Sequence, residues 1–235
     1  MAGRIILVRH GQSLWNQKNL FTGWVDVPLS PLGIEEALKA GDQLSKISFD
    51  IVFVSTLMRA MTTAMLALSR NASPRIALMQ HTDESTSDLK KQKDWSRIFS
   101  DKVQADSVPV FSAWELNERY YGELQGMDKT ETAKKYGDDQ VKLWRRSYDV
   151  PPPNGESLKM TAERTIPYYQ KTIEPLLKQG KTILVSAHGN SLRSIVMFLE
   201  KLTEEQVLSL ELATGVPRGY HLSDSGYTRK EIADF

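Results

Sequence analysis

Two histidines, His10 and His188, occupy the same local pattern, in which an apolar run comes first and a glycine follows. One histidine in such a place is usually a strand-ending residue that hydrogen-bonds to the backbone. The repetition of the pattern in a chain with four histidines favours a shared site. Imidazole can bind a metal, carry a proton or attack phosphorus, so the surrounding residues must decide between these chemistries.

Two arginines near these positions favour an anionic ligand. Arg9 precedes His10, and Arg59 lies in the first turn of a helix that the sequence predicts over residues 57–68. A cation there is disfavoured by ~0.3–1 kcal/mol unless an anion lies between it and the helix end. Arginine also repels metal ions, and no carboxylate pair is spaced to complete a ligand set, so we expect no metal. We expect a phosphoryl group instead, because guanidinium groups bind phosphate oxygens and keep a nearby imidazole unprotonated for attack on phosphorus.

Short apolar runs alternate along the chain with segments of helical periodicity. Strands are expected over residues 5–8, 49–55 and 182–187. Helices are expected from Pro31 to Leu44, over 57–68, from about 157 to 178 with interruptions at Pro167 and Pro175, and from near Asn190. This alternation predicts an α/β fold with three layers, in which a mainly parallel central sheet has helices on both faces. Ligands bind outside the carboxyl ends of the strands in such sheets, and Arg9, His10 and His188 stand there.

The segment of about 71–107 differs from the rest because it is polar, charged and without sustained periodicity. We expect a surface excursion that contains a helix or two and could act as an active-site lid. No clear linker, internal repeat or low-complexity tract divides the chain. A single domain over residues 1–235 is therefore expected.

Composition narrows the classes of partner. The net charge of +1 is too small for a general nucleic-acid or anionic-membrane binder. No apolar stretch approaches the ~20 residues of a membrane span. The absence of cysteine excludes disulfides, thiolate nucleophiles and cysteine-based metal sites. The start lacks the apolar core of a secretory signal, and we expect a cytoplasmic protein.

A proton carrier for the transferred oxygen is not evident from local pattern alone. Glu118, in the run WELNERYYG, is the candidate, although an acidic residue beside Arg119 is usually half of a surface ion pair. Arg145 and Arg146 similarly form a pair that most often belongs to a solvated helix face. Their meaning depends on whether the site binds a second anion.

A set of motifs resembles the cofactor-dependent phosphoglycerate mutases of the histidine phosphatase superfamily. The motifs are LVRHGQSLWNQKNLFTGW, STLMRA, LNERYYGELQGMDKTETAKKYG, VKLWRRSY, GESL, SAHGNSLR and ATGVP, in family order between Ile5 and Pro217. RHG alone is typical of the superfamily. FTGW, NERYYG, WRRS and HGNS together are typical of the mutase branch.

The resemblance implies a role for each matching residue. His10 would be the phosphorylated nucleophile and Glu118 the general acid and base. The transferring phosphoryl group would be held by Arg9, Arg59 and His188, with hydrogen bonds from Asn16, Gly189 and Asn190. The bound glycerate and its other anionic groups would contact Ser13, Thr22, Gly23, Arg119, Tyr121, Lys129, Arg145 and Arg146.

The activity that the resemblance implies is interconversion of 3-phosphoglycerate and 2-phosphoglycerate in glycolysis and gluconeogenesis, through a phosphohistidine. The implied cofactor is 2,3-bisphosphoglycerate, which phosphorylates the enzyme, without a metal. Phosphoglycerates are the implied small-molecule partners, and a homodimer or homotetramer is left open. Two alternatives also stand: a bisphosphoglycerate synthase, phosphatase or other phosphomonoesterase on the same scaffold, and a non-catalytic phospholigand-binding protein.

Some segments depart from the family pattern. The stretch between Arg59 and Glu118 is longer than in common bacterial members, and PPPNGESL is abbreviated. The tail after Val216 is short and matches poorly. Because the family tail helps to close the site, the balance between transfer and hydrolysis depends on these segments.

Overall fold

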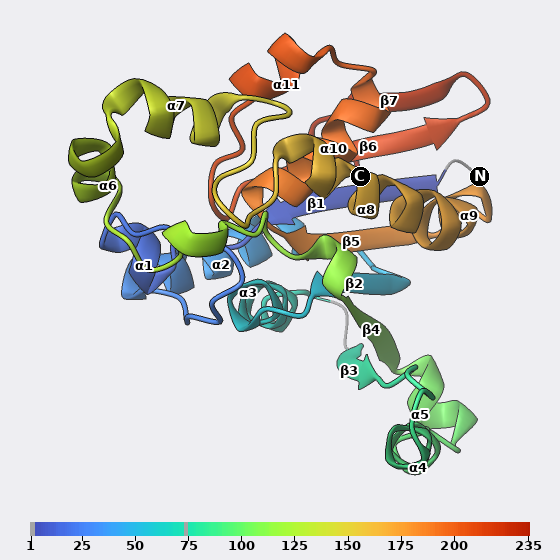
Figure 1. Cartoon of the computed structure of the whole chain (residues 1–235). Helices are drawn as coiled ribbons and strands as arrows, with labels where there is room; N and C mark the ends of the chain where they lie inside the picture. Colours follow the sequence, from blue (N-terminus) through green and yellow to red (C-terminus); the bar gives the residue numbers. More distant parts are fainter. Residues whose placement is uncertain (1–2, 73–74) are drawn as a thin grey trace.

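The centre of the computed structural model, which describes residues 3–72 and 75–235, is one sheet of seven strands (Figure 1). The strands are β1 (Gly3–Arg9), β2 (Ile51–Ser55), β3 (Ile76–Gln80), β4 (Ser107–Ala113), β5 (Thr182–Ala187), β6 (Pro217–Ser223) and β7 (Gly226–Lys230). Their order is β3-β4-β2-β5-β1-β6-β7. The first five in this order are parallel neighbours, whereas β6 and β7 are antiparallel. The sheet is mainly parallel, as predicted, with an antiparallel edge that the sequence patterns did not reveal.

Helices cover both faces of the sheet and give the predicted three layers. One face carries α2 (Pro31–Leu44) and α3 (Met58–Ser69), and the other carries α8 (Leu158–Tyr168), η3 (Tyr169–Ile173), α9 (Glu174–Lys178) and α10 (Gly189–Glu200). The other helices are α1 (Leu14–Gln17), α4 (Ser87–Trp95), α5 (Asp101–Ala105), α6 (Lys129–Tyr136), α7 (Asp138–Arg146), α11 (Glu204–Ser209), η1 (Trp114–Leu116), η2 (Gly122–Leu124) and η4 (Ile232–Asp234).

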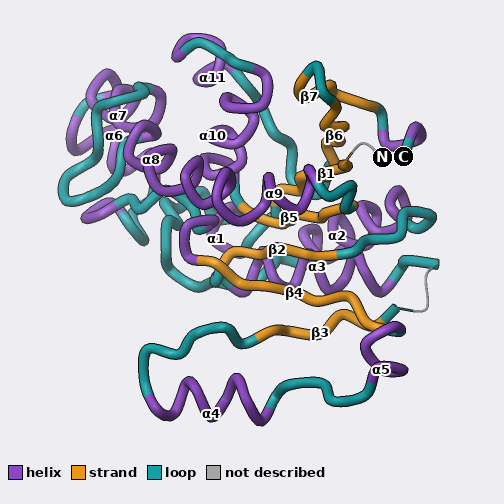
Figure 2. Tube along the Cα trace, turned by 90° about the vertical axis from the view of Figure 1, so that its right-hand side faces the viewer, coloured by secondary structure: helices purple, strands orange, loops and turns teal. Residues whose placement is uncertain are grey.

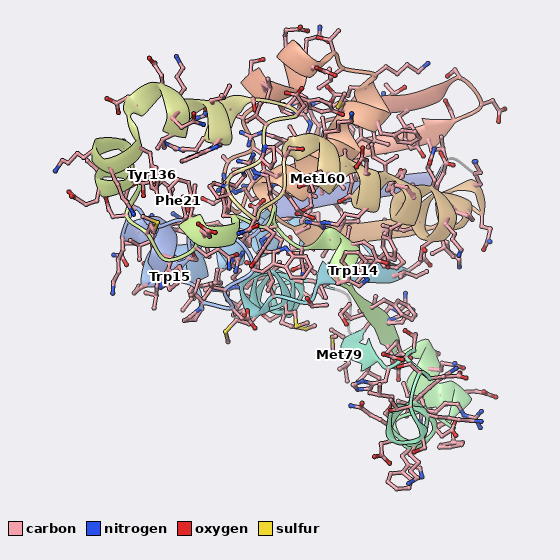
Figure 3. The ribbon with its side chains drawn as sticks, viewed as in Figure 1. Trp15, Phe21, Met79, Trp114, Tyr136 and Met160 are labelled. Carbon is pink, nitrogen blue, oxygen red and sulfur yellow. The ribbon has the colours of Figure 1, made fainter. Side chains whose placement is uncertain are left out.

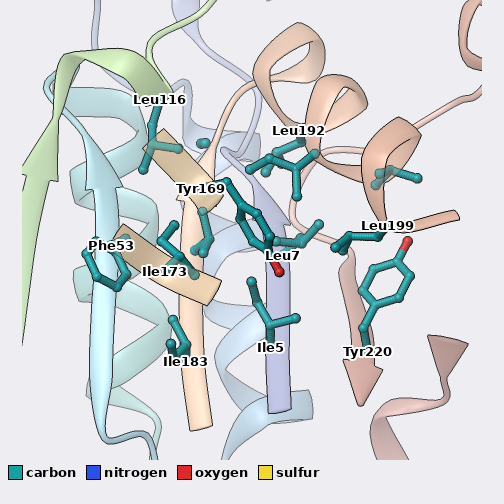
Figure 4. Close-up of a cluster of buried hydrophobic side chains, with 14 of the residues drawn as sticks. Ile5, Leu7, Phe53, Leu116, Tyr169, Ile173, Ile183, Leu192, Leu199 and Tyr220 are labelled. Carbon is teal, nitrogen blue, oxygen red and sulfur yellow. The ribbon is translucent and has the colours of Figure 1, made fainter. Parts of the chain in front are cut away.

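Strand β1 is buried on both faces, since its apolar run contains no alternating polar residues. Ile5 and Leu7 join the cluster under α8–α10, shown in Figure 4, and Ile6 and Val8 join the cluster under α2 and α3. All four side chains are at most 2% exposed, and each such burial contributes about 1.5–3 kcal/mol. The strand is therefore a rigid support for the residue that follows it, His10.

The turn after His10 is held by a close contact with the start of α2. Ser30 caps this helix by accepting a hydrogen bond from the Gly33 N–H (3.1 Å), and Pro31 occupies the first turn. A Cβ on Gly11 would lie 2.2 Å from the Gly33 carbonyl oxygen, and a Cβ on Gly33 would lie 2.0 Å from the Gln12 carbonyl oxygen. Both positions require glycine, so α2 fixes the backbone that carries His10.

The long helix predicted over residues 157–178 is present as three consecutive segments, α8, η3 and α9. Pro167 lies inside α8, and Pro175 lies in the first turn of α9. A proline nitrogen has no proton for the helical ladder, and η3, a π-helix, lies between the two prolines. The predicted interruption is therefore a widened turn, and the helical path continues through it.

The excursion of about 71–107 contains more regular structure than its polar sequence suggests. It includes β3, α4 and α5, and residues 73–74 within it lie outside the described residues. The strand β3 pairs with β4, with Ile76 opposite Ser107 at one end and Gln80 opposite Phe111 at the other. The sequence analysis also missed β4. Figure 2 shows α4 and α5 beyond β3, at the sheet edge opposite to β7. The predicted helices are confirmed, and the excursion adds a strand to the sheet.

The tail after Val216 forms β6, β7 and η4. Its last residue, Phe235, packs edge-on against His221, with ring centroids 4.7 Å apart. Strand β6 starts beside the end of β1 that leads to His10, since Pro217 pairs with Val8, and it runs away from the site until Leu222 pairs with Gly3. Strand β7 then returns along β6, from Gly226 opposite Ser223 to Lys230 opposite Gly219.

Candidate active site

A cavity of about 520 Å³ opens at the carboxyl ends of the parallel strands, where the sequence places the site. The predicted site residues that line it are Arg9, His10, Asn16, Thr22, Gly23, Arg59, Glu118, Arg119, Tyr121, Lys129, Arg145, Arg146, Gly189 and Asn190. Ser13 and His188 are not among the lining residues. The Ser13 hydroxyl caps α1 by accepting from the Asn16 N–H (3.1 Å), and His188 packs against His10.

The excursion does not cover this cavity. None of its described residues is among those that line the cavity. In Figure 3, Phe21, which lines the cavity, lies near α1 and α6, whereas Met79 of β3 lies on the side of the excursion. The prediction that residues 71–107 form an active-site lid is therefore wrong. A polar segment resembles a lid in sequence, but here it extends the sheet edge.

His10 is buried and has one ring nitrogen free for chemistry. Its Nδ1 lies 2.6 Å from the Gly11 carbonyl oxygen, and because a carbonyl oxygen only accepts, Nδ1 must carry the proton. Burial lowers the pKa of His10 well below its usual range, and the Arg59 and Arg9 charges lower it further. The ring is therefore neutral, and Nε2 keeps a lone pair that can attack phosphorus.

His188 lies beside His10, with ring centroids 4.8 Å apart. It is fully buried, and its Nε2 is 2.7 Å from the hydroxyl oxygen of Ser55, the last residue of β2. Burial lowers the pKa of His188, as do the charges of Arg59, His10 and Arg9. The structure thus brings the two neutral rings into contact, and the roles of His10 and His188 in a shared site stay predictions.

Arg59 and Arg9 are each held by backbone carbonyl groups from a different segment of the chain. Arg59 is 1% exposed and donates to the carbonyl oxygens of Gly23 (2.7 Å) and Val25 (2.9 Å). Arg9 donates to the Leu212 carbonyl oxygen (2.8 Å). Burial lowers the pKa of Arg59 to about 10, so the guanidinium remains charged at neutral pH. Backbone carbonyls thus fix two cations next to the His10 ring.

Several buried polar atoms around the cavity have no hydrogen-bond partner among the described residues. They are Nε of Arg9, Arg59 and Arg119, Oγ1 of Thr22, and Nδ1 of His188, whose ring packs against His10. A buried donor without a partner costs about 1–3 kcal/mol. Three cationic donors in this condition at one cavity indicate that an anion completes their hydrogen bonds.

Glu118 is buried with its carboxylate directed toward the start of α10. Its Oε1 accepts from the Arg119 N–H (2.8 Å), from the Asn190 side-chain amide (2.8 Å) and from the Asn190 N–H (3.2 Å). Burial raises the pKa of this carboxyl, but these hydrogen bonds and the charges of Arg9 and Arg59 outweigh it, and the pKa lies below its usual value. Glu118 is therefore ionised, and the surface ion pair that its sequence context suggested does not form.

The cavity also contains a second group of cations, Arg119, Lys129, Arg145 and Arg146. Arg119 is 1% exposed and donates to the Trp144 carbonyl oxygen (3.0 Å) and to the Tyr121 hydroxyl (3.2 Å). Burial lowers the pKa of Lys129. Arg145 and Arg146 end α7 and are exposed at the rim. Two groups of cations in one cavity fit a ligand with more than one anionic group.

Some lining residues were missed by the sequence analysis. Arg193 lies one helical turn after Asn190, and its Nη1 is 3.4 Å from the Asn190 side-chain oxygen. The segment 211–214 forms another part of the wall. The i to i+3 spacing after HGN would have indicated Arg193. Ala213 and Thr214 of this segment belong to the ATGVP motif, to which the sequence analysis gave no role in the site. The place of the segment in the wall depends on the hydrogen bond from the Arg9 side chain to the Leu212 carbonyl oxygen.

No group of three or more His, Cys, Asp or Glu residues in residues 3–72 and 75–235 is arranged to hold a metal ion. No helix in the described part of the chain is long and apolar enough to span a bilayer.

A family model for the histidine phosphatase superfamily (branch 1) matches residues 5–84 and 70–228, and the chain belongs to this superfamily. The 2,3-bisphosphoglycerate-dependent phosphoglycerate mutase of Protochlamydia amoebophila is 55% identical over 97% of this chain and 99% of the relative. The mutase of the same name from Chlamydia muridarum is 53% identical over 97% of this chain and 98% of the relative. These relatives show that, within the superfamily, the chain belongs to the 2,3-bisphosphoglycerate-dependent phosphoglycerate mutase family.

The fold is also similar to solved structures. A mycobacterial glucosyl-3-phosphoglycerate phosphatase in complex with VO3 superimposes with a TM-score of 0.74 and covers 98% of both chains. The sequence identity is 19%, so this similarity concerns the fold alone.

Proposed function

We propose that this chain interconverts 3-phosphoglycerate and 2-phosphoglycerate through a phosphohistidine on His10. The observation that supports this most directly is the free Nε2 of a neutral, buried His10 next to Arg9 and Arg59, with further cations in the same cavity. The names of the relatives at 53–55% identity agree with it.

The residues around His10 suit transfer in either direction. When phospho-His10 donates its phosphoryl group to a substrate hydroxyl, an O–P bond forms as the N–P bond breaks, and Glu118 takes the hydroxyl proton. In the return step Nε2 attacks phosphorus, the O–P bond breaks, and Glu118 gives the proton to the leaving oxygen. Arg9 and Arg59 stabilise the charge on the equatorial oxygens throughout.

The second group of cations favours a mutase over a simple phosphatase. Phosphoryl transfer within an organic acid requires that a carboxylate and a second phosphate stay bound while the intermediate turns. Arg119, Lys129 and the Arg145–Arg146 pair line the same cavity and can hold these groups. Hydrolysis needs one phosphate site and access for water, and does not require this second group.

We propose 2,3-bisphosphoglycerate as the cofactor, in keeping with the names of the relatives. The unpartnered donors of Arg9, Arg59 and Arg119 fit a molecule with anionic groups at both ends. When bound, it supplies the phosphoryl group that primes His10. We further propose that the enzyme is cytoplasmic, acts on phosphoglycerates and needs no metal. We also propose that it forms a homodimer or homotetramer, and sedimentation analysis can test this oligomeric state.

The decisive assay separates mutase from phosphatase activity. The protein is incubated with 3-phosphoglycerate and a trace of 2,3-bisphosphoglycerate, and 2-phosphoglycerate and free phosphate are followed together. We expect 2-phosphoglycerate to form much faster than phosphate. Phosphate appearing first would support the phosphatase alternative, and the absence of both products would support a binding protein.

Replacement of Arg145 by alanine is expected to weaken substrate binding more than the chemical step. The side chain is exposed at the rim and belongs to the second group of cations, so its loss removes binding to a group that does not react. Steady-state kinetics should show a KM raised about 10-fold with a smaller loss of kcat. As a control, Lys142→Ala on the same helix removes an exposed cation that does not line the cavity. A loss confined to kcat in Arg145→Ala would contradict this assignment.

Stability should depend on pH through His10. Its pKa is lowered in the folded protein, so below about 6.5 the unfolded chain binds the proton more readily, and stability falls as the pH decreases. The Tm of the parent should therefore drop more steeply between pH 7 and pH 5.5 than that of His10→Asn, which has no imidazole at this position. Equal slopes for the two proteins would show that the folded state does not depress this pKa.

A further inference from the structure

The GESL motif at residues 155–158 contributes nothing to the wall of the cavity. Its glutamate, Glu156, forms an ion pair with Arg164 of α8, with 2.8 Å between Nε and Oε1 and 2.9 Å between Nη2 and Oε2. The side chains are 9% exposed for Arg164 and 17% for Glu156. A bidentate, largely buried pair of this kind is geometrically specific.

The remaining donors of Arg164 hold the segment that carries Glu118. Nη1 donates to the Glu115 carbonyl oxygen (2.8 Å) and more distantly to that of Trp114 (3.4 Å). Nη2 donates to the carbonyl oxygens of Glu118 (2.9 Å) and Asn117 (3.1 Å). Every N–H of the guanidinium group therefore has an acceptor, and most of these acceptors lie on the backbone of residues 114–118.

The segment depends on these donors, because residues 116–118 are buried and lie outside the sheet, although Trp114 at its start is half exposed. Leu116 and Asn117 are at most 2% exposed, and buried carbonyl groups need partners. Glu156 extends the support in the other direction, since its Oε2 accepts from the Tyr120 N–H (2.9 Å). The indole N–H of Trp24 provides a second donor to the Glu118 carbonyl oxygen (2.6 Å).

We propose that Arg164, held by Glu156, is a positioning residue that sets the place of the Glu118 carboxylate through the backbone of residues 114–118. This inference rests on the proposed role of Glu118 as proton carrier. The carbonyl of Glu118 is fixed by Arg164 and Trp24, while its carboxylate is held by Arg119 and Asn190. An error of about 1 Å at such a group can lower a rate by about 100-fold.

The test uses Arg164→Lys in the full-length protein, because one ammonium group cannot replace a fork that holds several carbonyls. We expect kcat for phosphoglycerate interconversion to fall on the order of 100-fold, with KM within about twofold of the parent. The matched control is Arg218→Lys, since Arg218 forms a similarly buried pair with Glu200 (14% and 25% exposed) and does not line the cavity. The control should lose thermal stability and keep its kcat.

A double-mutant cycle tests whether Arg164 acts through Glu118. If it does, Arg164→Lys should lower the rate of Glu118→Gln very little, because the group that it positions is already missing. Fully multiplicative losses in the double variant would overturn the inference. If Arg164→Lys does not fold, Glu156→Gln serves instead, with the same direction expected and a smaller effect.

Amide hydrogen exchange gives a readout that does not depend on activity. The N–H groups of Arg119 and Asn190 both donate to the Glu118 carboxylate, and Asn190 lies in the first turn of α10, where no helical acceptor is available. Exchange at both amides should accelerate in Arg164→Lys and stay unchanged in Arg218→Lys. Unchanged exchange in Arg164→Lys would refute the positioning role, whereas an inactive parent would refute the proposed function and leave the exchange result to decide about Arg164.

Discussion

Replacement of His10 by alanine is expected to abolish phosphoenzyme formation and to lower the rate of phosphoglycerate interconversion on the order of 10⁶-fold, the scale of losing a nucleophile. The residue provides the only nitrogen with a free lone pair that the described part of the cavity places beside Arg9 and Arg59. No second imidazole lines the cavity in the described part of the chain: His188 packs against His10, with its Nε2 on the Ser55 hydroxyl and its Nδ1 unpartnered. The measurement is acid-labile phosphate on the protein after incubation with labelled 2,3-bisphosphoglycerate, together with the steady-state rate.

The comparison for His10→Ala is His221→Ala, which removes a histidine that packs against Phe235 in the tail. This control should keep the label and the rate. The His10 variant should still fold, because the backbone at this position is held by the hydrogen bond from the His10 N–H to the Ala187 carbonyl oxygen (3.0 Å), which alanine keeps. Full labelling of a folded His10→Ala protein would place the nucleophile elsewhere and overturn the mechanism.

Replacement of Glu118 by glutamine is expected to lower kcat by about 10²–10⁴-fold, the usual contribution of a general acid or base. The amide has nearly the same shape and can still accept a hydrogen bond, but it cannot take up or release the transferred proton. It also removes the negative charge that faces Arg9 and Arg59. Anionic substrate should therefore bind at least as tightly, and KM should be unchanged or lower.

The combination of a lower kcat with an unchanged or lower KM distinguishes this variant from a binding defect. Glu123→Gln is a suitable control, since this carboxylate is exposed, accepts from Asn154 and does not line the cavity. A Glu118→Gln enzyme with nearly normal kcat would show that another group, or water, carries the proton.

The strand that ends at His10 could be predicted because its signal is local. The run Ile5–Val8 has no polar alternation, which is typical of a strand covered on both faces, and β1 is buried in this way. The same reasoning found β2 and β5. It did not find β4, whose run SVPVFSA contains Pro109 and follows a polar segment, and whose pairing with β2 and β3 depends on distant chain.

Among the site residues, too, those with a local sequence signal could be predicted, and those that depend on distant segments could not. The pattern of Arg9, His10 and His188 at strand ends was sufficient to predict that they lie in one site, since neighbouring parallel strands have their carboxyl ends at one edge of the sheet. The sequence context of Glu118 suggested a surface ion pair, and only the resemblance to a family reversed that interpretation. The structure buries this carboxylate because Asn190 and the Arg119 N–H replace the water that an exposed carboxylate would bind.

Arg164 shows what no local pattern can reveal. In sequence it is an ordinary charged residue of a helix, and its donors reach carbonyl groups 46–50 positions earlier in the chain. The excursion is the converse case, in which polar composition suggested a lid and β-sheet pairing placed the segment at a distant edge.

By itself, the sequence determined the strand ends, the residue types that they present and the phosphoryl chemistry that those types support, because hydrophobic runs and side-chain chemistry are properties of neighbouring residues. Only the tertiary structure decided which imidazole nitrogen is free, how the Glu118 carboxylate is held and where the excursion and tail lie. Those properties depend on burial and on hydrogen bonds between distant segments. They arise when the chain excludes water from the groups that it brings together.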